Sequence, residues 1–465
     1  MSSIVAIAAA TAVLAIAWGL ARLRVVLAVA AGYKAKVLCT GIFGSGRDMD
    51  PSRDVQVHAD SYWILRPFRA RIDRERRRVT ASLFGLVPRT AIFRDGLGAT
   101  LQSGRHAPTT IGGAPDPQAG VAVTFRRGLG IGTRVSADAW TISPGSPDLH
   151  RLVDAAFEEP DPRRLRRTQA VVVVQDGCIV AERYASGIRV DMPLPGWSMT
   201  KSVLNALVGV LVSEGRLSLD ERELLPEWHS PDPCAAITLE DLLRMRSGLR
   251  FSEAYGFPWS DVLHLLYNCP DTAAFAASRP LVAQPGELWQ YASGTTNILS
   301  HIVRRRVGDA HYWTWPNSVL FDRIGMTSAV LEPDASGTFV CSSYMLATAR
   351  DWARYGQLWL DRGRHGHDEV LSDDWIRFST TPTPQSPDGR YGAHWWLKLN
   401  PDIGGDSPEA RTIAPDTFFA VGHEGQTLTI MPSKRAVVVR LGASVYVDAW
   451  NQASFTAAIQ DVLSA

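Results

Sequence analysis

The chain has 465 residues, which is enough for one large enzyme domain with extensions. A hydrophobic content of 46% allows a sizeable core, and a formal net charge of +1 gives no reason to expect a nucleic acid partner. The five cysteines lack Cys-x-x-Cys spacing and no nucleotide-binding glycine loop is present, so we expect no metal site, no disulfide framework and no cofactor.

The N-terminus is apolar. From Ile4 to Leu20 the residues are almost all Ala, Val, Ile and Leu, a length near the lower limit for crossing a bilayer. We therefore expect residues 1–36 to be a membrane anchor or a signal segment. The run lacks the basic residues that precede a signal-peptide core. Its positive charges, Arg22 and Arg24, come after it, which by the positive-inside rule favours a cytoplasmic catalytic portion.

Residues 37–150 are expected to form a β-rich extension. Short runs of alternating or β-branched residues are separated by turn dipeptides such as Asp95-Gly96. No catalytic constellation occurs in this region. The expected strands are Arg78–Leu86, Arg89–Phe93, Gly120–Phe125 and Trp140–Ile142.

Residues 151–465 are expected to form the main domain. A β-hairpin opens it, with Gln175-Asp176-Gly177 as the turn, and two further strands and a final helix close the chain. Strands at both ends with helices between them predict an α/β (α+β) fold in which one sheet is built from the two termini of the domain and covered by helices.

A buried helix is predicted after Ser198. Apolar residues recur at three- and four-residue intervals from Val203 to Val212, and Gly215 offers a left-handed stop. Ser198 and Lys201 lie on one face of its first turn, close enough to exchange a proton. Serine needs a neighbouring base, and burial together with the helix dipole makes the lysine proton easier to lose.

Three motifs in order give the chain a resemblance to a known superfamily. They are Ser198-Met199-Thr200-Lys201, Tyr291-Ala292-Ser293 and His423-Glu424-Gly425. On these residues the chain resembles the serine β-lactamase and penicillin-binding-protein superfamily, in the class C-like branch with the aminohexanoate-dimer hydrolases and related esterases. The resemblance covers Thr168 to the C-terminus. It implies a β-lactamase-like antiparallel sheet flanked by helices, with a mostly helical subdomain.

The resemblance also implies roles for particular residues. Ser198 would attack a carbonyl, Lys201 would accept or relay its proton, and Tyr291 would act as a base or as the acid for the leaving group. The backbone N–H groups of Ser198 and Gln426 would form the oxyanion hole. Residues expected to contact the substrate are His423, Gly425, Ser293, Tyr255, Asp261 and Trp396.

Two departures from the β-lactamase pattern bear on the substrate. Ser293 stands where true class C enzymes have an asparagine, and His423 stands where they have a lysine that would attract a carboxylate. Both argue against efficient β-lactam hydrolysis. They favour a metal-independent esterase or amidase that acts on small or linear substrates through an acyl-serine.

Two alternatives stay open. One is a D-amino-acid peptidase or penicillin-binding-type enzyme, and the other is a catalytically silent, membrane-anchored binding protein. The N-terminal segment is expected to attach the chain to a bacterial inner membrane, and the resemblance implies a periplasmic catalytic domain. The arginines after the apolar run favour the opposite side, and the sequence does not decide between them.

Overall fold

The largest sheet joins the two ends of the catalytic domain. The computed structural model describes residues 2–464 apart from 53, 55, 57–59 and 103–139. Six strands pair in the order β13-β14-β15-β6-β7-β5, and every pairing is antiparallel except β5 with β7. Their bounds are β5 (Thr141–Ile142), β6 (Thr168–Gln175), β7 (Cys178–Tyr184), β13 (Phe418–Gly422), β14 (Gln426–Met431) and β15 (Ala436–Gly442). The predicted β-lactamase-like α+β architecture is confirmed.

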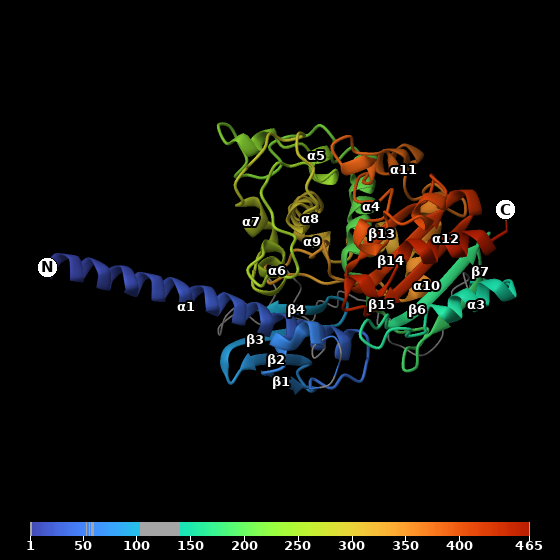
Figure 1. Cartoon of the computed structure of the whole chain (residues 1–465). Helices are drawn as coiled ribbons and strands as arrows, with labels where there is room; N and C mark the ends of the chain where they lie inside the picture. The colour runs from blue at the N-terminus through green and yellow to red at the C-terminus, as the bar shows by residue number, and fades with distance from the viewer. Residues whose placement is uncertain (1, 53, 55, 57–59, 103–139, 465) are drawn as a thin grey trace.

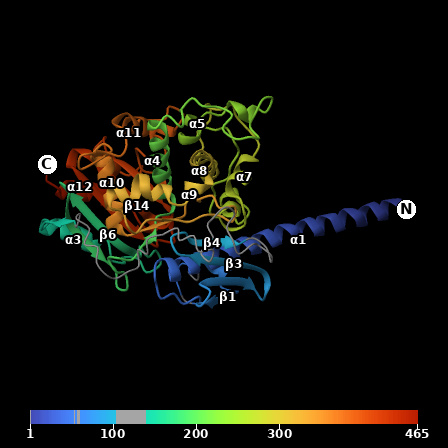
Figure 2. The same ribbon diagram turned by 180° about the vertical axis from the view of Figure 1, so that it is seen from behind.

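Helices cover both faces of this sheet, which explains the unbroken apolar run of β6. Val172 and Val174 point into the main core under α10 (Ala349–Leu360), while Val171 and Val173 point into a second cluster under α3 (Pro147–Ala155) and α12 (Gln452–Val462). All eight residues of β6 are therefore buried. The helices α3, α10 and α12 lie around the sheet on the side of the C-terminus, opposite the projecting N-terminus (Figures 1 and 2).

A mostly helical subdomain packs beside the sheet. Helices α4 and α8 are in contact where the subdomain meets the sheet, and α7 packs against α8. The helices of this part are α4 (Thr200–Ser213), α5 (Leu239–Leu243), α6 (Asp261–Tyr267), α7 (Thr272–Ala277), α8 (Ser293–Val307), α9 (Asp309–Tyr312) and α11 (Asp373–Thr380). Short strands connect them: β8 (Leu194–Pro195), β9 (Val330–Leu331), β10 (Met345–Ala347), β11 (Arg364–His365) and β12 (Asp368–Glu369).

The N-terminal extension is a four-stranded antiparallel sheet packed on helix α1 (Ser2–Cys39). Its strands are β1 (Phe68–Asp73), β2 (Arg78–Leu83), β3 (Leu86–Arg94) and β4 (Gly98–Gln102). Small residues such as Ala35 on the helix and Ala91 on the sheet are fully buried, so the two backbones approach closely. The strands expected at 78–86 and 89–93 are present as β2 and β3, and the one expected at 120–125 lies outside the described residues.

Two expected domain boundaries fall inside elements. Helix α1 continues through residue 36 to Cys39, and α3 begins at Pro147, before residue 151. Strand β5, expected within the extension, pairs with β7 in the large sheet. The physical reason is the same in both cases, because an element is kept whole by the surface on which it packs and not by a change in local composition.

Helix α1 has two halves with different surroundings. The described residues from Ala9 to Arg24 are exposed, whereas Ala28 to Ile42 are buried in the extension. A stretch of mean hydropathy 2.0 makes this helix long and apolar enough to cross a membrane. In Figure 1 its first half projects from the body as a lone rod.

A buried ion pair ties α1 to the catalytic domain. The Lys36 ammonium lies 2.5 Å from Glu332, and both side chains are almost completely buried. Lys36 also donates to the Ala99 carbonyl, and Glu332 accepts from the Ala99 N–H and the Thr40 hydroxyl. Lys36 and the neighbouring Lys34 thus belong to the core of the extension. Hydrogen-bonded partners on every side make the burial of these two charges tolerable.

Candidate active site

The predicted nucleophile stands at the start of α4, beside the predicted base. A 3-10 turn, Trp197–Met199, precedes α4, and Trp197 adopts a left-handed backbone (φ 49°) that is uncommon for a residue with a side chain. Ser198 remains partly exposed, while residues from Thr200 to Leu211 are buried. The Lys201 ammonium nitrogen lies 3.0 Å from the Ser198 hydroxyl oxygen. The structure therefore brings the first pair together as the spacing predicts.

Lys201 is held by two further acceptors. It donates to the Ser342 carbonyl at 2.8 Å and contacts the Ser293 hydroxyl at 3.2 Å. Burial lowers the pKa of Lys201 to about 8, and the negative charge of Glu253 opposes that shift. With this pKa, roughly one lysine in ten is neutral at pH 7 and able to take a proton.

Tyr291 lies against both members of this pair. Its hydroxyl hydrogen-bonds with Ser198, and the Lys201 nitrogen stands 4.8 Å from the centre of its ring. Burial, and then the charge of Glu253, raise the pKa of Tyr291 above its ordinary value. The side chain is therefore a phenol at neutral pH and can donate a hydrogen bond or a proton.

Glu253 completes the polar network, and sequence reasoning missed it. Its carboxylate accepts from the Ser293 hydroxyl at 2.6 Å and from the Ser293 N–H at 2.9 Å. Burial raises the pKa of Glu253, and the positive charge of Lys201 counteracts that rise. The signal available in the sequence was an acid between Phe251 and Tyr255, in a stretch already considered for the cleft.

The third motif forms a tight turn between β13 and β14. His423 stacks on Tyr255 with ring centres 4.7 Å apart and meets the edge of Trp197 at 5.3 Å. Burial lowers the pKa of His423 to about 4, so the imidazole is neutral at pH 7. The next residue, Glu424, has a left-handed backbone (φ 61°) and accepts from the Gln56 side chain of the extension at 2.8 Å.

Contacts with strand β15 fix Gly425 and Gln426. A side chain at Gly425 would lie 2.2 Å from the Arg440 guanidinium, which donates to the Gly425 carbonyl at 2.7 Å. The Gln426 amide exchanges hydrogen bonds with both backbone groups of Gly442. Strands β13 and β14 both pack against the 3-10 turn that carries Ser198, so the backbone of Gln426 starts a strand beside Ser198.

A cavity of about 440 Å³ opens over these residues. Its aromatic wall includes Tyr255, Trp289, Tyr291 and Trp396, with Trp396 5.3 Å from Tyr291 between ring centres. Three carboxylates line it, and among its described lining residues there is no lysine or arginine. The predicted residues on the wall are Ser198, Tyr255, Tyr291, Trp396, His423 and Gly425; Lys201, Ser293 and Gln426 are buried behind it.

Asp261, expected to contact the substrate, does not line this cavity. It sits in the first turn of α6, accepts from the Ser252 N–H at 2.8 Å and lies 3.5 Å from Arg279. Its carboxylate thereby holds the loop that carries Glu253.

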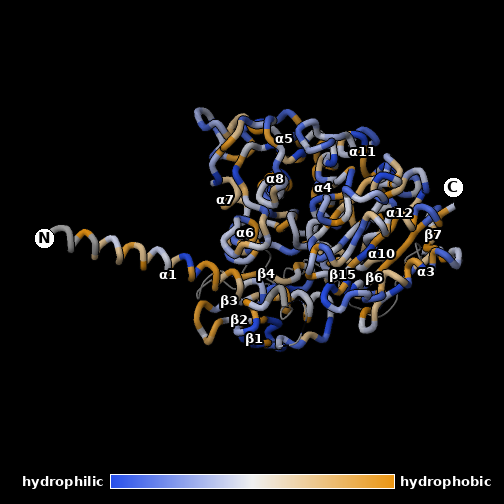
Figure 3. Tube along the Cα trace, in the orientation of Figure 1, coloured by the Kyte–Doolittle hydropathy of each residue, from blue (hydrophilic) through white to orange (hydrophobic). Residues whose placement is uncertain are grey.

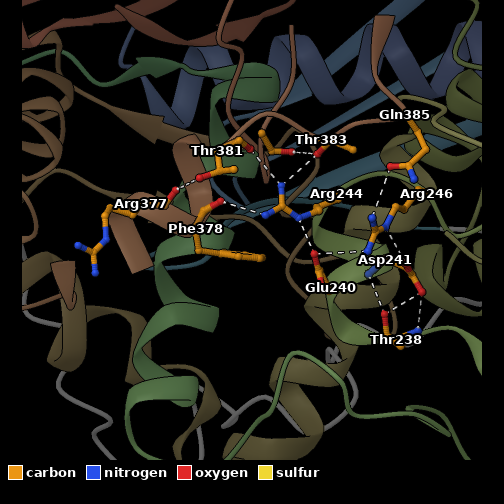
Figure 4. Close-up of polar contacts among 11 residues, drawn as sticks. Thr238, Glu240, Asp241, Arg244, Arg246, Arg377, Phe378, Thr381, Thr383 and Gln385 are labelled. Carbon is orange, nitrogen blue, oxygen red and sulfur yellow. Dashed lines mark hydrogen bonds and ion pairs between the residues drawn. The ribbon is translucent and has the colours of Figure 1, made fainter. Parts of the chain in front are cut away.

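A buried arginine network supports the loop before Tyr291 (Figure 4). Arg244, at the end of α5, pairs with Glu240 at 2.8 Å and donates to the Phe378 and Thr381 carbonyls around the end of α11. The following residue, Met245, has a left-handed backbone, and its carbonyl accepts from the N–H of Gln290, next to Tyr291. The end of α5 is thus joined both to the end of α11 and to the loop that carries Tyr291 into the wall of the cavity.

An antiparallel sheet built from both ends of the domain and a helical subdomain give the chain a β-lactamase-like architecture, and its family makes it a serine hydrolase. The family model described as Beta-lactamase matches residues 153–457, and the chain belongs to this beta-lactamase family. The predicted class of enzyme and the predicted resemblance are confirmed.

The proteins to which this chain is similar include an aminohexanoate-dimer hydrolase and a carboxylesterase. The chain is 26% identical over 328 residues to the 6-aminohexanoate-dimer hydrolase of Paenarthrobacter ureafaciens, covering 65% of this chain and 79% of that protein. Among solved structures, a putative 6-aminohexanoate-dimer hydrolase from Bacillus anthracis shares its fold with a TM-score of 0.55 and 22% identity, covering 70% of this chain and 86% of that one. A family VIII carboxylesterase gives a TM-score of 0.53 and 16% identity, with coverages of 69% and 99%.

Proposed function

We propose that this chain hydrolyses ester or amide bonds of small or linear substrates through an acyl-serine intermediate. The observation that carries the proposal is the 3.0 Å contact between Lys201 and Ser198, made by a lysine whose pKa burial lowers to about 8. A base with a pKa near the working pH is the kind that serves proton transfer.

The residues divide the chemistry as follows. Neutral Lys201 takes the hydroxyl proton of Ser198, whose oxygen forms a bond to the substrate carbonyl carbon. The N–H groups of Ser198 and Gln426 stabilise the oxyanion, a contribution of about 3 kcal/mol per donor. As the carbonyl re-forms, the bond to the leaving group breaks, and the Tyr291 phenol supplies the leaving group with a proton that Lys201 replaces. Water attacks the acyl-serine by the reverse proton path and releases the acid.

The charge of the cavity narrows the substrate class. Glu253, Asp402 and Glu424 line it, and His423 is neutral at pH 7 because burial lowers its pKa to about 4. A substrate carboxylate would meet repulsion there, whereas a neutral chain or an ammonium group would not. We therefore propose neutral or cationic substrates. The same argument disfavours penicillins and carboxylate-ended peptides.

The decisive experiment measures intact mass after exposure to a fluorophosphonate, together with turnover of short-chain nitrophenyl esters. The unsubstituted chain should gain one adduct and turn over ester, and Ser198→Ala should lose both. Ser213→Ala is the matched control, because Ser213 lies at the other end of α4 and bonds only its own helix in the described contacts. A folded chain with neither adduct nor turnover would make it a silent binding protein.

A second arm of this experiment tests the substrate charge. An ester whose acyl chain ends in a carboxylate should react about tenfold or more slowly than its uncharged or amine-ended counterpart. Penicillin should leave no stable adduct. A penicillin adduct at Ser198 would instead support the penicillin-binding alternative.

We further propose that the exposed half of α1 anchors the enzyme in a bacterial inner membrane, with the catalytic domain in the periplasm. The length and hydropathy of α1 support the anchor, and the family resemblance supports the side. Protease added to intact spheroplasts should digest the catalytic domain. Protection of that domain would place it in the cytoplasm, as Arg22 and Arg24 favour.

A further inference from the structure

Three large apolar side chains are exposed at one end of the extension sheet. They are Trp63, Phe84 and Leu86, with exposed fractions of 67%, 72% and 62%. We call them the apolar rim. A cluster of this kind on a small sheet, outside the catalytic cavity, calls for a partner that removes it from water.

The pairing of the strands places the connection that carries Phe84 and Leu86 at one end of the sheet. Phe68, the first residue of β1, pairs with Leu83, the last residue of β2, and Leu83 pairs with Leu86 at the start of β3. Trp63 lies in the 3-10 turn Asp60–Leu65 that leads into β1. Phe84 and Leu86 therefore lie at this end of the sheet, and Trp63 precedes the strand that begins there.

This is the end of the sheet from which α1 leaves the fold. Near the C-terminal end of α1, the Cys39 thiol contacts the Ala91 carbonyl of β3. Further back, the charge of Arg24 acts on Arg89, two residues nearer to the β2–β3 connection. In Figures 1 and 3 the β2–β3 connection lies on the side of the projecting half of α1, and Figure 3 colours much of both as hydrophobic.

The charge around the rim is predominantly positive, although Asp60 begins the turn that carries Trp63. No Asp or Glu occurs in residues 1–47, 61–72 or 76–94, and arginines occur in all three stretches. Arg22, Arg24, Arg66 and Arg69 are exposed. The acids of this sheet lie at its opposite end, where Asp73 and Asp95 pair with arginines of the β1–β2 turn.

We propose that the apolar rim is a second lipid contact, which enters the headgroup layer of the membrane that α1 crosses while the neighbouring arginines bind phosphates of anionic lipids. Aromatic and aliphatic side chains with arginines around them are the composition that partitions to this layer. Continuity with the apolar half of α1 selects a bilayer over a protein partner. The contact holds the catalytic domain at a fixed tilt to the membrane. It rests on the proposed anchor, and the ester chemistry is independent of it.

The test uses the full chain reconstituted in vesicles with and without phosphatidylglycerol. An environment-sensitive fluorophore is attached to Phe84→Cys. The control is Ile142→Cys, since Ile142 is 65% exposed on β5, at the edge of the large sheet. The unsubstituted chain gives the background of its five native thiols. Phe84 already has a left-handed backbone, so a smaller side chain adds no strain there.

The proposal expects a blue shift and quenching by nitroxide-labelled lipid at position 84 but not at 142, with stronger quenching when phosphatidylglycerol is present. Exchange of Arg66 and Arg69 for glutamine should remove that dependence on anionic lipid. Equal signals at 84 and 142, in a chain that still co-sediments with vesicles and hydrolyses ester, would overturn the lipid contact while leaving the anchor and the activity standing. Protection of position 84 in detergent, in particles of twice the mass, would overturn it in favour of a second copy.

Discussion

At the scale of residues, the proposed chemistry depends on a buried lysine whose pKa is lowered. Burial alone lowers the pKa of Lys201, and Glu253 limits the shift from behind Ser293. The carboxylate therefore has two effects. It holds Ser293 in place, and its negative charge keeps the pKa of Lys201 from falling further.

The first prediction concerns the pH dependence of turnover. The active form has neutral Lys201, so kcat/KM for an uncharged nitrophenyl ester should rise with pH through about 8 and then level off. Glu253→Gln removes the charge that raises the lysine pKa, so the midpoint should move to lower pH. The maximal rate should fall about tenfold or more, because a charge-assisted hydrogen bond to Ser293 is lost.

The matched control for this shift is Asp402→Asn. Asp402 is another carboxylate on the cavity wall, but its charge does not contribute to the pKa of Lys201. Its variant should keep the midpoint of the unsubstituted enzyme. An unchanged midpoint in Glu253→Gln would contradict the electrostatic link.

The site residues that could be predicted from the sequence are those whose spacing along one element brings them together. Ser198 and Lys201 are three apart on a helix, so their contact follows from helical geometry alone. Glu253 was missed because its partner, Ser293, is forty residues away, and only the folded loop brings them together. Asp261 was assigned to the cleft from its loop, but the direction of its side chain depends on the Ser252 N–H that needs an acceptor.

At the scale of elements, the wall of the cavity is held by contacts between helices that are distant in sequence. Arg244 closes the end of α5 onto the end of α11, with a side chain that is only 7% exposed (Figure 4). Its planar fork reaches Glu240 and two backbone carbonyls at once. Lysine cannot reproduce this geometry.

The second prediction is that Arg244→Lys destabilises the fold by about 2–4 kcal/mol, because two carbonyls and a carboxylate lose well-placed donors. Arg377→Lys is the control within the same figure: Arg377 is 64% exposed and pairs with Asp374 on the surface of α11. That variant should stay within about 0.5 kcal/mol of the parent. Denaturant unfolding followed by tryptophan fluorescence measures both. Equal stability of the two variants would show that the network is not needed for packing.

Helices and strands could be predicted from the sequence where their pattern is local. The β6–β7 hairpin, the strands of the third motif and the buried helix α4 lie where turn residues and apolar spacing put them. The extent of α1 could not be predicted from a local pattern. Its two halves are similarly apolar, but one is exposed and the other packs on the sheet of the extension. The buried Lys34 and Lys36 resemble the charged end of a membrane segment until Leu65, Ala99 and Glu332 are known to accept from them.

At the scale of the whole molecule, the extension is joined to the catalytic domain at two places, one of which is in the wall of the cavity. Lys36 pairs with Glu332, and Gln56 donates to Glu424 in the turn of the third motif. Gln56 is in turn held by the Tyr33 hydroxyl and by Arg47. The extension therefore helps to fix the conformation of the turn His423–Gly425, which directly precedes Gln426.

The last prediction separates the two halves of α1 by deletion. Removal of residues 2–24 takes away only the projecting half, and should give a chain that leaves the membrane and keeps its ester turnover. Removal of residues 2–39 also takes Tyr33 and Lys36. It leaves Glu332 as a buried carboxylate without its cation, at a cost of about 3–5 kcal/mol. Because the support of Gln56 is lost as well, turnover should fall together with the melting temperature. Membrane release, thermal unfolding and ester turnover of the two deletions measure this difference, and equal activity in both would show that the extension does not shape the site.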